Sequence, residues 1–184
     1  MPSYSHRLDR LISKSTGMKR SDVRALLAQG RVKVDGCVAT DIAQAIGQFT
    51  HVAVDGRVLQ ARKPLYIMMN KPAGVVSATR DQRHPTVIDL LERSDRHQLH
   101  ISGRLDFNST GLILLSNDGA WSRRLSLPEC AIAKVYTVTV AKPLNADYVD
   151  AFAAGMPFAY ENIATRPATL RLLSEQVAEV ILTE

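Results

Sequence analysis

The sequence predicts an α+β protein in two parts, a small module of helices and hairpins followed by a larger domain built on strands. Three observations lead to this class. Apolar residues recur at helical spacing near the N-terminus, short alternating segments follow them, and strand-sized apolar runs occupy the rest of the chain. A short polar linker over residues 60–64 separates the two expected domains, residues 1–60 and 61–184.

Two short helices open the chain. The first is expected over residues 6–14, with cations on the side opposite its apolar residues. Ser21 is expected to cap the second helix, and Gly30 to end it. The apolar positions that predict both helices are Leu8, Leu11, Ile12, Val23, Leu26 and Leu27.

Two alternating segments follow the helices. Residues 31–36 alternate valine with cations and end in Asp35-Gly36, and residues 51–58 nearly repeat this pattern around Asp55-Gly56. Asp-Gly beside alternating apolar residues is a signal for a tight hairpin. We therefore expect a small β-element after the helices.

The second domain is expected to consist of strands separated by turns and a short helix. Its first strand is an apolar run that we expect to be buried, ended by a Pro-Gly turn at residues 70–74. The expected elements are strands at residues 65–69 and 112–115, a helix at 121–127, and strands that open at residue 134 and span 177–184.

Composition indicates a globular protein and excludes several other classes. Of 184 residues, 46% are hydrophobic and 22% charged, near the globular average. No apolar run approaches the roughly 18 residues of a membrane span, and the N-terminus has no apolar stretch typical of a signal peptide. We therefore expect a cytoplasmic protein with no membrane partner.

Cysteine and histidine usage predicts neither disulfides nor a metal site. Cys37 and Cys130 are widely separated, which excludes a disulfide framework and a zinc ribbon. Only His97 and His100 are close together, and no other ligand types stand near them at metal spacing. We interpret this pair as ordinary surface residues.

Positive charge is concentrated in the first third of the chain. The net charge is +5, but residues 1–63 alone hold 11 Lys/Arg against 5 Asp/Glu. This asymmetry indicates that the N-terminal third meets a polyanion, although a solvated helix face would look similar. The cations that cluster at the second helix and the following strand are Lys19, Arg20, Arg24, Arg31 and Lys33.

Two charged residues of the second domain have more than one interpretation. Asp106 lies in a polar loop just before an apolar strand, where a rigid element can hold a nucleophilic carboxylate, but it can equally form a turn. Lys71 precedes the Pro-Gly turn, where it can reach a phosphate or simply be solvated.

Residues 103–119, GRLDFNSTGLILLSNDG, resemble the GRLD…GLLLLTNDG signature of bacterial pseudouridine synthases. Residues 7–36 are similar to the S4-type RNA-binding domain. Together they match the family of bacterial ribosomal small-subunit pseudouridine synthase A, which joins the two domains. Further landmarks of that family are Asn70-Lys71-Pro72-Ala73-Gly74, His84-Pro85-Thr86-Val87 and Lys134-Val135-Tyr136.

This resemblance implies roles for individual residues. Asp106 matches the catalytic aspartate. Tyr136 matches a second catalytic residue of the family, a tyrosine that packs on the target base and can assist proton removal, and this role is compatible with a place in the core. Arg104 matches an arginine that approaches the RNA, with a structural ion pair as the alternative. Lys71 and the five N-terminal cations are expected to bind RNA.

The resemblance also implies a reaction and a fold. The expected reaction isomerises a specific uridine of 16S ribosomal RNA, free or in an assembling small subunit, without cofactor or metal, by a monomer. The expected catalytic fold is a mixed, largely antiparallel sheet flanked by helices. The alternatives are a large-subunit rRNA synthase, a catalytically inert S4-type protein of ribosome assembly, and an unrelated hydrolase that uses Asp106 with a histidine.

One feature of the family has no counterpart in this sequence. The family continues past the strand at residues 177–184 with a Gly-Arg-Tyr-His-Gln-type segment, which supplies a basic residue that pairs with the catalytic aspartate. Because every upstream motif is present, we expect that the sequence is a truncated form of the family's chain.

Overall fold

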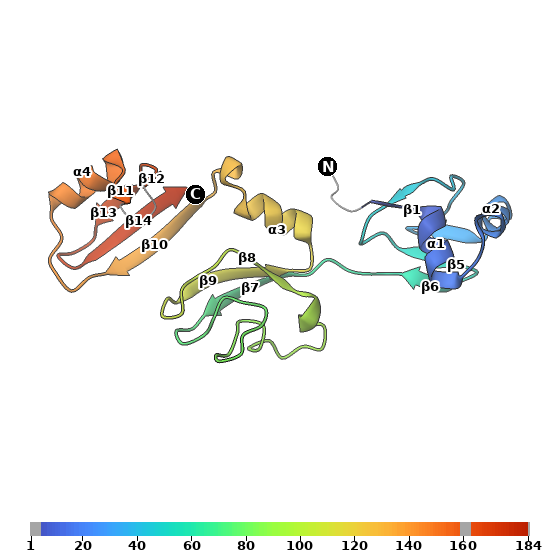
Figure 1. The fold of residues 1–184 in the computed structure, drawn as a ribbon, viewed down its shortest axis with the longest axis horizontal. Coiled ribbons are helices and arrows are strands. Elements are labelled where there is room, and N and C mark those ends of the chain that lie inside the picture. The colour runs from blue at the N-terminus through green and yellow to red at the C-terminus, as the bar shows by residue number, and fades with distance from the viewer. Residues whose placement is uncertain (1–4, 159–162, 184) are drawn as a thin grey trace. The chain divides into compact units, whose positions relative to one another are not determined.

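The computed structural model describes residues 5–158 and 163–183 and divides into two compact units, residues 1–122 and 123–184 (Figure 1). The α-helices of the described residues are α1 (Leu8–Thr16), α2 (Arg20–Ala28), α3 (Gly119–Ser126) and α4 (Ala146–Ala154). The strands of the first unit are β1 (His6–Arg7), β2 (Val32–Val34), β3 (Cys37–Val38), β4 (Ala45–Ile46), β5 (Val52–Val54), β6 (Arg57–Gln60), β7 (Tyr66–Lys71), β8 (His100–Ser102) and β9 (Gly111–Ser116). Those of the second unit are β10 (Ala133–Thr139), β11 (Pro157–Phe158), β12 (Ile163–Ala164), β13 (Thr169–Leu172) and β14 (Val177–Thr183).

Residues 5–60, here called the N-terminal module, form a small core of their own. The helices α1 and α2 and the antiparallel sheet β3–β2–β5–β6 supply its buried side chains. Gly17, with a φ of 75°, ends α1 in the left-handed conformation that glycine adopts without strain. The buried residues are Leu8, Ile12, Val23, Leu26, Leu27, Val32, Val34, Ala39, Ile46, Val52 and Val54.

The structure confirms most local predictions for this module and corrects one. Both Asp-Gly pairs are two-residue hairpin turns, with φ values of 49° and 84° at Asp35 and Gly36, which suit the right-handed twist of the joined strands. Ser21, however, lies inside α2 and does not cap it. The residue before the helix is Lys19, whose backbone N–H donates to the carboxylate of Asp22 at 3.3 Å.

The second sheet of the first unit, here called the central sheet, has the order β7–β9–β8 and is antiparallel throughout. Its register pairs Tyr66 with Ser116 at one end and Lys71 with Gly111 at the other. The prediction that the first strand is buried was wrong in part. Alternate side chains of β7 face solvent, and Tyr66 and Met68 are 53% and 76% exposed, because only one face of the sheet is covered.

The unit formed by residues 123–184 has a smaller core. Its three-stranded antiparallel sheet has the order β10–β14–β13, and α4 packs against β13. The buried residues are Leu170, Ala178 and Val180. The expected antiparallel pairing is therefore confirmed, but the described strands form separate sheets in the two units. No helix of the described residues is long and apolar enough to cross a membrane.

Candidate active site

Asp106 lies in the loop of residues 103–110, here called the Asp106 loop, which joins the paired strands β8 and β9. Its side chain is exposed, and no hydrogen-bond or ion-pair partner of its carboxylate occurs among the described residues. The N–H of Ser109 donates to the carbonyl of Asp106 at 3.0 Å and closes a tight turn. The carboxylate of Asp106 is thus presented to solvent from a structured loop.

The buried side chain of Lys71 fixes the Asp106 loop through hydrogen bonds to its backbone carbonyls. At the end of β7 its side chain is fully buried, and its ammonium donates to the carbonyls of Asp106 (2.9 Å) and Ser109 (2.8 Å). It also reaches the carbonyls of Phe107 (3.3 Å) and Pro72 (3.1 Å). A buried ammonium needs such partners because desolvation is otherwise strongly unfavourable.

This placement corrects the prediction that Lys71 binds RNA. Its ammonium is enclosed by backbone carbonyls and presents no donor at the surface. Sequence reasoning placed Lys71 at the surface, where it would reach a phosphate or be solvated, because a turn follows it. Three of its four carbonyl partners lie 35 to 38 positions further along the chain, where no local pattern reveals them.

Two further contacts fix the Asp106 loop, and sequence reasoning missed both. The buried Ser77 hydroxyl donates to the carbonyl of Leu105 at 2.6 Å and accepts from its N–H at 3.1 Å. The N–H of Gly74 donates to the carbonyl of Phe107 at 2.9 Å. The Pro-Gly turn was a signal for Gly74, whereas no signal in the sequence distinguishes Ser77 from other serines. Backbone groups on both sides of Asp106 are therefore held by Ser77, Gly74 and Lys71.

Arg104 is exposed, two residues before Asp106. Within the described part of the chain its guanidinium has neither a hydrogen-bond nor an ion-pair partner. The alternative interpretation, a structural ion pair, therefore finds no support among these residues.

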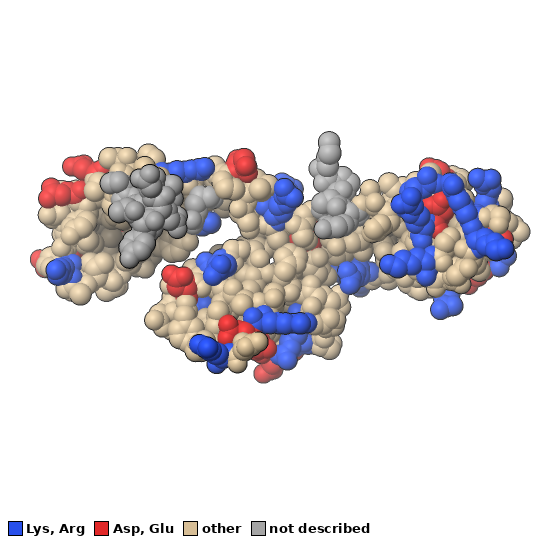
Figure 2. All heavy atoms as spheres, in the orientation of Figure 1, with Lys and Arg blue, Asp and Glu red and all other residues tan. Residues whose placement is uncertain are grey.

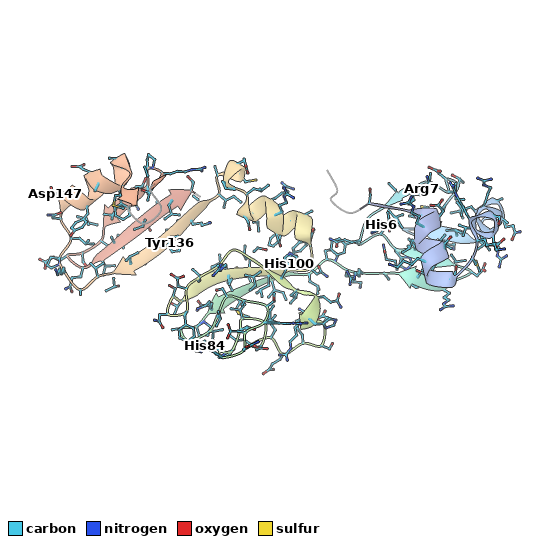
Figure 3. All side chains as sticks on the ribbon, viewed as in Figure 1. His6, Arg7, His84, His100, Tyr136 and Asp147 are labelled. Carbon is cyan, nitrogen blue, oxygen red and sulfur yellow. The ribbon has the colours of Figure 1, made fainter. Side chains whose placement is uncertain are left out.

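Tyr136 belongs to the other unit. It lies on β10, opposite Val180 of β14, half-buried against the small core of that unit (Figure 3). The strand that was predicted to open at residue 134 is thus confirmed. Asp106 belongs to the unit of residues 1–122, and Tyr136 belongs to the unit of residues 123–184.

The five predicted cations of the N-terminal module are all exposed, and Figure 2 shows Lys and Arg atoms gathered over this module. Two of them form ion pairs. Arg20 pairs with Asp9 at 2.8 Å, and Arg31 forms a bidentate pair with Asp55 at 2.6 and 2.7 Å. The cations with no ion-pair partner in the described part of the chain are Lys19, Arg24 and Lys33.

The paired carboxylates of this module are held in their charged form. Hydrogen bonds from Arg7 lower the pKa of Asp9 below its usual range despite its burial, and Arg20 adds to this effect. The hydrogen bond from Arg31 likewise lowers the pKa of Asp55. Hydrogen bonds that favour a charged form are expected to shift a pKa in this direction.

Neither His97 nor His100, the two histidines that lie close together in the sequence, supports the hydrolase alternative. The Nε2 atom of His100 lies 2.7 Å from the hydroxyl of Ser122, at α3, and the Nδ1 atom of His97 lies 3.1 Å from the carbonyl of Ser94. Among residues 5–158 and 163–183, no His, Cys, Asp and Glu side chains gather into a group of three that could hold a metal.

Comparison with known proteins extends this geometry. The family model described as RNA pseudouridylate synthase matches residues 65–161, a range that includes the Asp106 loop and β10. Ribosomal small subunit pseudouridine synthase A of Pseudomonas aeruginosa is 48% identical over 179 residues, which cover 97% of this chain and 78% of that protein. The protein of the same name in Escherichia coli K12 is 36% identical, with the same coverage of both chains.

A solved structure is similar as well. A crystal structure described as pseudouridylate synthase superposes with a TM-score of 0.64 at 32% sequence identity. The match covers 97% of this chain and 77% of that chain. The similarity therefore extends over nearly all the elements described above.

Proposed function

Because this chain belongs to the RNA pseudouridylate synthase family and is an isomerase that converts uridine to pseudouridine, we propose that its substrate is one specific uridine of 16S ribosomal RNA in the small subunit. The single observation that carries this proposal is the solvent-facing carboxylate of Asp106, which has no partner among the described residues and lies on a loop whose backbone is held on both sides. The relatives named for the small ribosomal subunit support the choice of RNA.

Asp106 is the catalytic residue in this proposal. Pseudouridine formation breaks the N1–C1′ bond, turns the uracil, joins C5 to C1′ and releases the C5 proton while N1 gains one. A carboxylate suits this series of reaction steps because it can form a covalent adduct with the nucleoside, at C1′ or at C6, and then leave again. Its exposure allows a uridine to approach once it has left the RNA stack, at an unstacking penalty of a few kcal/mol.

Tyr136 and Arg104 also have proposed roles in the reaction, each within its own unit. We assign Tyr136 to packing on the target base and Arg104 to the RNA where that base has left the stack. The guanidinium of Arg104 has no partner among the residues that the structure describes, which supports its role because such a cation is available to a phosphate or base. Residues 61–184 would form the catalytic domain.

The N-terminal module, within residues 1–60, is the proposed S4-type RNA-binding domain. Its support is a helix–helix–strand order, a separate core and a set of exposed cations. Cations that neutralise phosphates bind RNA in a salt-dependent way. Binding through this module raises the local RNA concentration at Asp106 and offsets the unstacking penalty. We propose that the protein acts on rRNA as a cytoplasmic monomer with no membrane partner.

Release of tritium from [5-³H]uridine-labelled 16S rRNA in a single turnover tests this function. The chain should release tritium, Asp106→Asn should not, and the matched control Asp147→Asn, which removes an exposed carboxylate on α4, should behave as the wild type. Salt-sensitive RNA binding with no release by the wild type would contradict the proposal and favour an inert RNA-binding protein.

A further inference from the structure

Phe107, the residue after Asp106, is an exposed aromatic ring on a fixed backbone. Its carbonyl accepts from the N–H of Gly74 and from the ammonium of Lys71, so the position of its Cα is constrained. The residue is nevertheless 39% exposed and belongs to none of the three cores found among the described residues. Exposing a large apolar ring is unfavourable, and such a ring beside a reactive group indicates a binding role.

His84 extends this aromatic surface. Its ring lies against Phe107, with centroids 4.8 Å apart and planes tilted by 54°. Its backbone N–H donates to the Asp81 carboxylate at 2.9 Å, and the next residue, Pro85, accepts from the N–H of Val76. Its ring nitrogens have no hydrogen-bond partner within the described part of the chain. Figure 3 shows His84 among the loops beside the central sheet.

Positive charge accompanies the two rings. The exposed segment 79–85 carries Arg80 and Arg83, neither of which has an ion-pair partner among the described residues. The one carboxylate of that segment, Asp81, accepts from the backbone N–H groups of Arg83 and His84, which lowers its pKa. The carboxylate therefore orders the segment while both guanidinium groups remain available to phosphates.

We propose that Phe107 and His84 form an aromatic ledge on which a base flanking the target uridine stacks. This inference rests on the proposed function and adds a substrate-positioning site to it. Single-stranded RNA is bound by aromatic rings that stack on bases, combined with cations that contact the backbone, and this surface offers both. A base held on the ledge fixes the strand next to Asp106 and so places the extruded uridine at the carboxylate.

The test compares variants that keep or remove the aromatic ring. Phe107→Leu keeps the apolar volume but loses the stacking surface, and it should raise the KM for 16S rRNA about tenfold. Phe107→Tyr keeps an aromatic ring and should therefore have the same KM as the wild type. His84→Ala should raise KM about threefold, since it removes the smaller ring of the ledge. Thermal unfolding midpoints identify any variant that does not fold.

A modified substrate makes the test specific. Once the modified uridine is mapped in the wild-type product, RNAs with an abasic nucleotide on either side of it are compared with intact RNA. On one of these RNAs the wild type should show the raised KM, and Phe107→Leu should add nothing further. An unchanged KM for Phe107→Leu, or an equal loss on every RNA, overturns the ledge. Absence of tritium release by the wild type instead overturns the proposed function, so the two failures are distinguishable.

Discussion

The N-terminal module keeps its cations at the surface, whereas the central sheet buries one beneath the Asp106 loop. Lys19, Arg24 and Lys33 are exposed and unpaired among the described residues, and the core below them is apolar. Lys71, in contrast, has no exposed surface and is held by backbone carbonyls. Charge on the surface is available to a ligand, whereas buried charge orders the chain around it. The comparison separates binding in one region from positioning in the other.

The largest effect should come from Asp106→Asn. This change keeps the shape of the side chain but removes the nucleophilic charge, so the single-turnover rate should fall by about a thousandfold or more. RNA affinity should remain as in the wild type, because binding is assigned mainly to the N-terminal module. Filter binding beside tritium release checks both values. A parallel loss of affinity would break the division between the two regions.

Lys71→Met should have the next largest effect. It leaves the carbonyls of Asp106 and Ser109 buried without their donor, and we expect a loss of about 3 kcal/mol in the free energy of unfolding. The loosened Asp106 loop should also lower kcat. Urea denaturation measures the first effect. The matched control is Lys63→Met, at an exposed lysine of the linker, which should change neither value.

Asp9→Asn should weaken the N-terminal module in a pH-dependent way. The pKa of Asp9 is lowered in the folded protein, so its stabilising contribution is present above the ordinary value of 3.8 and is lost as pH falls through the lowered value. We expect a loss of about 2 kcal/mol at pH 7. Urea denaturation at pH 7 and pH 3 should show the difference from wild type shrinking in acid. A constant difference would exclude this linkage.

The smallest expected effect is on RNA affinity, and it compares an arginine without an ion-pair partner among the described residues, Arg24, with a paired one, Arg31. Arg24→Gln should weaken RNA binding several-fold and reduce the slope of log K against log salt by about 0.7, the value for one single-strand phosphate contact. Arg31→Gln should do less, because Asp55 already offsets the charge of Arg31. Binding isotherms at four salt concentrations measure both slopes. Equal slopes for the two variants would show that the Arg31–Asp55 pair opens on RNA.

Most predictions that depended on neighbouring residues succeeded, although Ser21 does not cap α2. The Asp-Gly turns, the two helices of the N-terminal module and the alternation of buried Val32 and Val34 with exposed Lys33 follow from local backbone preferences and from periodicity. The position of Asp106 in a loop before a strand was likewise visible in the sequence.

The tertiary structure alone decided which chemical groups meet. The sequence by itself determined the helices and turns of the N-terminal module, several strands of the second domain and which carboxylate is the candidate nucleophile, but not α4, β8 or β13. The sequence did not determine that Lys71 is buried against the carbonyl of Asp106, that Ser77 is hydrogen-bonded to Leu105 or that the ring of His84 contacts Phe107. Each of these contacts joins residues 23 or more positions apart. A side chain's type states what it can bind, but its burial depends on the groups that the folded chain brings to it.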